Sequence, residues 1–146
     1  MRAIQFIKDS SAEGAALAVD IPTPSPTGYD ILVKIKAIGL NPVDFKVRPG
    51  EGEDPKILGY DAAGTVISLG ERVSLFKESD RVYYAGDITR PGSNAEFQLV
   101  DSRIVAARPT SLDAAECAAL PLTALTAWES LFHRLRINPN TPDMNS

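Results

Sequence analysis

A proline-rich connector beside an alternating strand is the feature that most constrains the fold of this chain. Residues 22–28 read PTPSPTG, with prolines at every second position. Because proline lacks a backbone donor, this stretch cannot join the centre of a sheet. Directly afterwards, every second position of 31–37 is apolar, while Lys34 and Lys36 point the other way. This period of two indicates a half-buried strand.

Other short runs have the same strand character. Residues 2–8 and 81–85 are such runs, and in 95–100 Ala95, Phe97 and Leu99 fall on a common side. Many short strands separated by turn residues indicate a β-barrel or sandwich rather than a βαβ array. At 146 residues, of which 44% are hydrophobic, the chain is large enough for one domain with a core. We therefore expect a mainly β domain with a few helices.

The pattern becomes helical after residue 109. Thr110 and Ser111 occupy the position of a helix N-cap, and Asp113 falls in the favourable first turn. We expect a short helix through Ala119 that breaks at Pro121.

A second, amphipathic helix is expected beyond that break. Its apolar residues recur at spacings of three and four, which is the period of one helical face. They are Leu122, Leu125, Trp128, Phe132 and Leu135. Trp128 is expected in the core. Residues 138–146 are rich in turn residues and are expected to be a linker or a frayed tail, which leaves residues 1–137 as the domain.

Charge and cysteine content exclude several classes of protein. The net charge is −4, and no run of basic residues is longer than a pair, which argues against nucleic acid as a partner. The N-terminal apolar run is too short for a signal peptide, and no stretch approaches the ~20 apolar residues of a membrane span. The single cysteine, Cys117, excludes an internal disulfide and suits a reducing compartment. We expect a cytoplasmic protein with no membrane partner.

Two segments carry the residues from which we expect chemistry. Residues 37–50 read AIGLNPVDFKVRPG, and residues 55–66 read PKILGYDAAGTV. Asn41 precedes Pro42 and is placed to cap a short helix running to about Arg48. The amide of Asn41 can instead hydrogen-bond a ligand in a neighbouring cleft. The second segment presents the phenol of Tyr60 beside Asp61, for which we favour a structural role.

With FKESDRV at residues 76–82 and ALPLTALTAW at 119–128, these segments resemble the medium-chain dehydrogenase/reductases. The similarity is to the branch of quinone oxidoreductases and zinc-type alcohol dehydrogenase-like proteins. It runs from Met1 to about Ile137, with Ser79 in place of a family glycine. The resemblance implies a GroES-like, partly open β-barrel that binds substrate. In full-length relatives a Rossmann domain follows, and the chain then returns to complete the first domain.

The resemblance also allows a test for zinc. Zinc-dependent relatives carry three catalytic ligands and a hydroxyl relay at positions where this chain has other residues. Those positions are Asn41, Tyr60 and Leu122 for the ligands and Val43 for the relay. A protein zinc site draws three or four ligands mainly from His and Cys, yet this chain has one of each, His133 and Cys117. The four-cysteine lobe of some relatives is also missing. We expect no zinc.

The family geometry assigns cofactor contacts to three residues. It implies that the corner of Asn41 and Pro42 lies against the nicotinamide ring and that Thr126 meets the carboxamide. The alternative for Thr126 is a hydrogen bond back to a helical carbonyl. No Gly-x-Gly-x-x-Gly segment opens a helix after a strand here. NADPH or NADH is therefore expected to bind the full-length protein and not these residues alone, so we expect a chain that stops before its cofactor domain and is inactive alone.

The resulting hypothesis is the N-terminal domain of a zinc-independent, NAD(P)H-dependent reductase of small carbonyl, enone or quinone compounds. Asn41 and Tyr60 would donate hydrogen bonds to the developing oxyanion, and either Tyr60 or solvent would supply the proton. We also expect self-association through apolar surface that the missing parts would cover, including one side of the 121–135 helix. The alternatives are a zinc-type alcohol dehydrogenase and a stand-alone GroES-like binding or assembly module.

Overall fold

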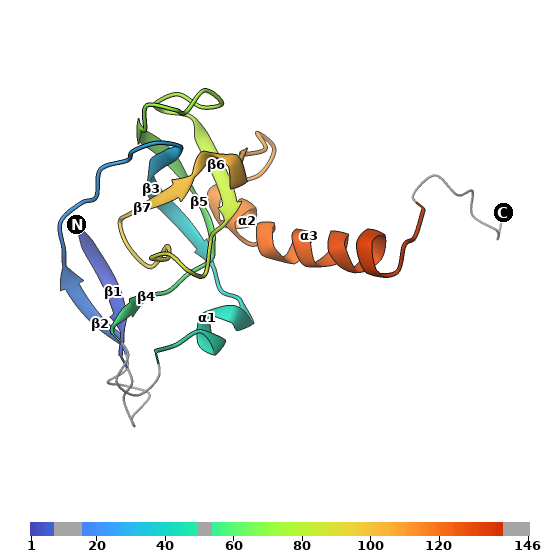
Figure 1. Ribbon diagram of the computed structural model, residues 1–146, viewed down its shortest axis with the longest axis horizontal. Helices are drawn as coiled ribbons and strands as arrows, with labels where there is room; N and C mark the ends of the chain where they lie inside the picture. Colours follow the sequence, from blue (N-terminus) through green and yellow to red (C-terminus); the bar gives the residue numbers. More distant parts are fainter. Residues whose placement is uncertain (8–15, 50–53, 139–146) are drawn as a thin grey trace.

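The computed structural model describes residues 1–7, 16–49 and 54–138, which form two antiparallel sheets and several short helices (Figure 1). The strands are β1 Arg2–Phe6, β2 Ala16–Asp20, β3 Asp30–Gly39, β4 Lys56–Ile57, β5 Asp61–Leu69, β6 Arg81–Ala85, β7 Phe97–Asp101 and β8 Val105–Ala107. Their order is β7-β3-β5-β6-β8 in the larger sheet and β2-β1-β4 in the smaller one.

The two sheets meet through the segment before β7. Ala3 of β1 bridges Ala95, and the amide of Ile4 donates to the carbonyl of Asn94 at 2.8 Å. On the other side, the amide of Ile35 in β3 donates to the carbonyl of Glu96 at 3.0 Å. The two sheets do not close into one ring, so the expectation of a mainly β, partly open barrel is confirmed.

The main core cluster is formed by side chains of the larger sheet, from β3, β5, β6 and β7. Ile31, Val33, Val66 and Val82 are almost completely buried there, and burial of this kind supplies the main driving force for folding. The alternation expected for residues 31–37 is confirmed, because Lys34 and Lys36 are exposed on the opposite side. The proline-rich connector at 22–28 forms no strand, also as expected.

The helices are α1 Pro42–Lys46, the 3-10 turn η1 Ser102–Ile104, α2 Ala114–Ala118, α3 Pro121–Trp128 and the π-helical η2 Glu129–Arg134. The assignment of the α2 cap to Thr110 and Ser111 is wrong, since the N-cap is Asp113. Asp113 accepts a hydrogen bond from the Glu116 amide at 2.9 Å, and Glu116 accepts one from the Asp113 amide at 2.8 Å. This reciprocal capping box satisfies two amides at once, which places the helix start two or three residues later than predicted.

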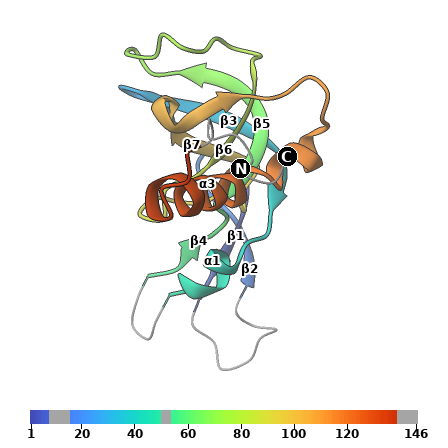
Figure 2. The same ribbon diagram turned by 90° about the vertical axis from the view of Figure 1, so that its right-hand side faces the viewer.

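The helix formed by α3 and η2 projects away from the barrel (Figures 1 and 2). Leu125, Trp128 and Leu135 are 52%, 57% and 68% exposed, so the placement of Trp128 in the core is wrong. Its ring instead packs on Phe132, with the centroids 4.4 Å apart. Asn138 is described, and the rest of the expected tail, 139–146, lies outside the described residues. Within the described ranges, no helix has the length and apolar character needed to cross a membrane.

Candidate active site

The Asp61 carboxylate joins the three elements that carry the candidate site. Asp61 begins β5 and is 2% exposed. One of its oxygens accepts a hydrogen bond from the backbone amide of Leu122 at 2.7 Å, at the start of α3. The other accepts from the side-chain Nδ2 of Asn41 at 3.3 Å, just before α1. This carboxylate therefore fixes the start of α3 and the orientation of the Asn41 amide.

Asn41 is the N-cap of α1, and Pro42 is its first helical residue. The carboxylate of Asp44 accepts a hydrogen bond from the Asn41 backbone amide at 2.7 Å, while the Asp44 amide donates to the Asn41 carbonyl at 2.9 Å. The predicted cap is thus found, although α1 ends at Lys46 instead of continuing to Arg48. Because an amide nitrogen carries two protons, Nδ2 of Asn41 can serve a ligand as well as Asp61.

Tyr60 precedes Asp61 and lines a cavity of about 300 Å³. The tyrosine is 3% exposed, and its backbone carbonyl accepts from the Gly86 amide at 2.7 Å. The residue before it, Gly59, has a φ of +104°, which residues with a side chain rarely adopt. The cavity is lined by Gln5, Pro55, Lys56, Ile57, Tyr60, Ile88, Thr89, Arg90 and Pro91.

Burial raises the pKa values of both acids at this corner. Burial is the main cause of the raised pKa of the Tyr60 phenol, and the negative charge of Asp44 acts in the same direction, while Lys56 opposes them. Burial likewise raises the pKa of the Asp61 carboxyl, against the hydrogen bonds from Leu122 and Asn41. The Tyr60 phenol therefore keeps its proton at neutral pH and is a hydrogen-bond donor.

Thr126 lies one helical turn beyond the anchored start of α3. Its hydroxyl donates to the carbonyl of Leu122 at 2.8 Å, which is the back-bonded alternative considered from the sequence. The oxygen lone pairs of an exposed hydroxyl can still accept from a ligand. Asn41 and Thr126 are thus linked through Asp61 and Leu122, whereas neither is among the residues that line the Tyr60 cavity.

The residues at the family's zinc-ligand positions make other contacts here. Leu122 presents an aliphatic side chain, and Asn41 is engaged with Asp61. Cys117 is completely buried beside Ala118, as expected, and His133 lies exposed in η2. Within residues 1–7, 16–49 and 54–138, no three His, Cys, Asp or Glu side chains are grouped as metal ligands would be. These residues do not fit a tetrahedral zinc site.

Sequence reasoning missed the loop that forms one wall of the Tyr60 cavity. No sequence pattern singled out four consecutive residues of this wall, 88–91. The only notable feature of these residues in the sequence is the pair Arg90-Pro91, and no local pattern links that pair to Tyr60.

Comparisons with known proteins agree with this architecture. Residues 27–110 match the family described as the alcohol dehydrogenase GroES-like domain. A zinc-type alcohol dehydrogenase-like protein of Staphylococcus epidermidis is 46% identical over 110 residues, covering 75% of this chain and 33% of the relative. The 2-methylene-furan-3-one reductase of Solanum lycopersicum is 38% identical over 144 residues, covering 90% of this chain and 37% of the relative.

A solved structure shows the same fold. The quinone oxidoreductase of Escherichia coli, crystallised with NADPH, superposes with a TM-score of 0.77 at 28% identity, covering 96% of this chain and 43% of that one. The chain spans about a third of the length of the two curated relatives. The protein is thus a member of the medium-chain dehydrogenase/reductases, and it carries the GroES-like domain of that oxidoreductase family, matched over residues 27–110.

Proposed function

We propose that this domain is the substrate side of a zinc-independent, NAD(P)H-dependent reductase that acts on small enones or quinones. The observation that carries the proposal is the pair of hydrogen-bond donors at one corner of the barrel. Asn41 is oriented by the buried Asp61, and Tyr60, which directly precedes Asp61 and keeps its phenol protonated, lines a cavity. Two relatives, named a furanone reductase and a quinone oxidoreductase, support this substrate class.

In the proposed reaction, the reduced nicotinamide would supply a hydride to an electrophilic carbon of the substrate. The electron pair displaced from the conjugated system would then collect on the carbonyl oxygen. Asn41 and Tyr60 would stabilise that oxygen by hydrogen bonds that strengthen as charge develops. Because burial raises the pKa of Tyr60, its first role is to donate a hydrogen bond, and either Tyr60 or water then supplies the proton.

Asn41, Pro42 and Thr126 are the residues we propose to contact the nicotinamide. Pro42 fixes the backbone at the start of α1, and the Thr126 oxygen can accept from an amide group. The 146 residues contain no glycine-rich phosphate loop. We therefore expect that a polypeptide of these residues alone neither binds NADPH nor turns over, in what we propose is a cytoplasmic enzyme.

The test is turnover of the full-length protein with NADPH and menadione. Tyr60→Phe and Asn41→Ala should each lower kcat by about 10²–10³, the usual loss for one oxyanion donor. Tyr29→Phe is the matched control, since Tyr29 is 40% exposed and stacks on Arg103 instead of lining this cavity. Normal turnover in both site variants would contradict the proposed roles of Asn41 and Tyr60. Stoichiometric zinc in the purified protein would favour an alcohol dehydrogenase instead.

We also propose that the exposed apolar side of α3 and η2 is a contact surface. Leu125, Trp128 and Leu135 are each more than half exposed, which is unusual for side chains of this size on one helix. Sedimentation of the 146-residue chain should show a concentration-dependent mass, and Trp128→Ser should reduce it. A monomer at every concentration would contradict this.

A further inference from the structure

The wall of the Tyr60 cavity is a loop whose two ends are fastened differently from its middle. The ends of residues 86–94, here called the 86–94 loop, are held by backbone hydrogen bonds to the segment that carries Tyr60. Gly86 donates to the Tyr60 carbonyl, Gly92 to that of Ile57 and Asn94 to that of Leu58, at 2.7, 2.7 and 2.8 Å. These bonds leave the middle of the loop, residues 87–91, to be positioned in another way.

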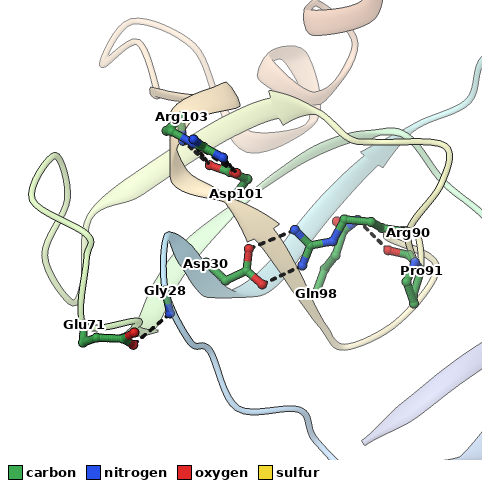
Figure 3. A network of polar contacts seen from close by, with 8 residues as sticks. All are labelled: Gly28, Asp30, Glu71, Arg90, Pro91, Gln98, Asp101 and Arg103. Carbon is green, nitrogen blue, oxygen red and sulfur yellow. Dashed lines mark hydrogen bonds and ion pairs between the residues drawn. The ribbon is translucent and has the colours of Figure 1, made fainter.

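Side chains hold that middle part (Figure 3). The Arg90 guanidinium donates two parallel hydrogen bonds to the Asp30 carboxylate, at 2.9 and 2.7 Å. Next to it, the Pro91 carbonyl accepts from Nε2 of Gln98 at 3.1 Å, and the buried Tyr84 hydroxyl fixes Gln98 by a bond of 2.8 Å. Both contacts reach across to strands β3 and β7 of the larger sheet.

The Asp30–Arg90 pair is stronger than an ordinary surface ion pair. The two side chains are only 21% and 32% exposed, and a two-pronged arginine–carboxylate contact restricts both distance and direction. The contact with Asp30 is also the main reason why the pKa of Arg90 is raised above its usual value. The nearby Asp101–Arg103 pair is equally short, at 2.6 Å, but its arginine is 64% exposed and lies outside the Tyr60 cavity.

Arg90 faces the Tyr60 cavity while Asp30 does not. Ile88, Thr89, Arg90 and Pro91 supply four of the nine lining residues, and Asp30 is not one of them. Any effect of Asp30 on the cavity must therefore pass through Arg90 and the loop. From this arrangement we infer that Asp30 and Arg90 are positioning residues, which hold the 86–94 loop as the wall that determines how the substrate fits beside Tyr60.

This inference rests on the proposed function for its substrate, and its test separates the two. In the full-length protein, Asp30→Asn should raise the KM for menadione about tenfold and change kcat less than about threefold, because the loop wall moves while Asn41 and Tyr60 keep their places. Hydrogen exchange of the 86–94 amides should become faster in the same variant. Arg90→Lys keeps the charge but loses the paired geometry, so its KM should lie between wild type and Asp30→Asn.

Arg2→Gln is the control, because it removes an exposed arginine–glutamate pair, Arg2–Glu96, whose residues do not line the Tyr60 cavity, and it should leave both measurements unchanged. Faster exchange with an unchanged KM, or an unchanged exchange rate in Asp30→Asn, would overturn the inference. If the wild type shows no turnover, the Kd for menadione from fluorescence quenching replaces KM, so that the proposed function can fail while the positioning role is still decided. A wild type that does not bind menadione would overturn both.

Discussion

Replacement of Asp61 by asparagine tests whether one buried carboxylate holds the candidate site together. The wild-type side chain accepts from the Leu122 amide and from Asn41, at 2.7 and 3.3 Å. Asparagine has the same shape but only one acceptor oxygen, so its NH₂ group must face one of these two donors. A lost hydrogen bond to a charged acceptor costs about 1.5–3 kcal/mol.

We expect the lower end of this range for Asp61→Asn. The raised pKa of Asp61 shows that burial penalises the ionised carboxylate, and the neutral asparagine does not bear that penalty. A loss of about 1.5 kcal/mol corresponds to a fall in Tm of about 3–6 °C for a chain of this size.

The stability difference between wild type and Asp61→Asn should also change with pH in a definite direction. Because the folded-state pKa of Asp61 lies above its unfolded value, ionisation of this group opposes folding as the pH rises through the folded pKa. The stabilisation that the protonated Asp61 side chain contributes is therefore fully present below the unfolded pKa of about 4. The stability advantage of wild type over Asp61→Asn should therefore increase, and not disappear, as the pH falls from about 7 to about 4.

Urea unfolding at several pH values measures both effects. Circular dichroism reports the sheets, and fluorescence of Trp128, the single tryptophan, reports α3. Thr126→Val is the control on the same helix, since its exposed hydroxyl bonds only to the neighbouring turn and should change stability by less than about 0.5 kcal/mol. Equal stability of Asp61→Asn and wild type at pH 7, or an advantage that vanishes in acid, would refute the reasoning.

Three further substitutions test the backbone and the surface charges. Ser79 has a φ of +72°, so Ser79→Gly should stabilise the chain by roughly 0.5–1 kcal/mol in thermal unfolding; a lower Tm would contradict this. Gly59→Ala should destabilise by about 1–3 kcal/mol, since the added Cβ would lie 2.5 Å from Oγ of Ser93 at a positive φ. Arg103 lowers the pKa of Asp101 to about 2, so the stability difference between wild type and Asp101→Asn should be present above pH 4 and shrink between pH 4 and 2. A difference that stays constant in that interval would exclude the ion pair as its source.

The strands that could be predicted are those with a clear alternation. β3 and β6 show it, because one face of each is buried while the other meets solvent. β5 was not predicted, although it is the central strand, since its first half consists of small residues buried on both sides. Gly64 shows why: a Cβ there would lie 2.4 Å from the carbonyl oxygen of Lys34. A strand that lies this close to its neighbour has room only for small residues. It therefore lacks the alternating large apolar side chains from which strands are predicted.

In the candidate site, contacts between neighbouring residues could be predicted from the sequence, whereas contacts between distant residues could not. The cap at Asn41 follows from its immediate neighbours, Pro42 and Asp44. The bond from Leu122 to Asp61 joins residues 61 positions apart, and the pair of Arg90 with Asp30 joins residues 60 apart. No local pattern encodes such contacts, so they emerge only once the sheets bring the elements together.

These two long-range contacts fix different parts of the site. Asp61 orients the donor Asn41 and the start of α3, whereas Asp30 acts through Arg90 on the wall beside Tyr60. Among the described residues the two acids share no hydrogen-bond partner, so their effects on stability should add. If the proposed roles hold, their effects on catalysis should differ in kind, because loss of Asp61 would disturb Asn41, the proposed donor to the reacting oxygen, while loss of Asp30 would disturb only the fit of the substrate. A fall in kcat for Asp61→Asn beside a rise in KM for Asp30→Asn would therefore identify the barrel itself, independently of the cofactor-binding part, as the source of both substrate fit and oxyanion stabilisation.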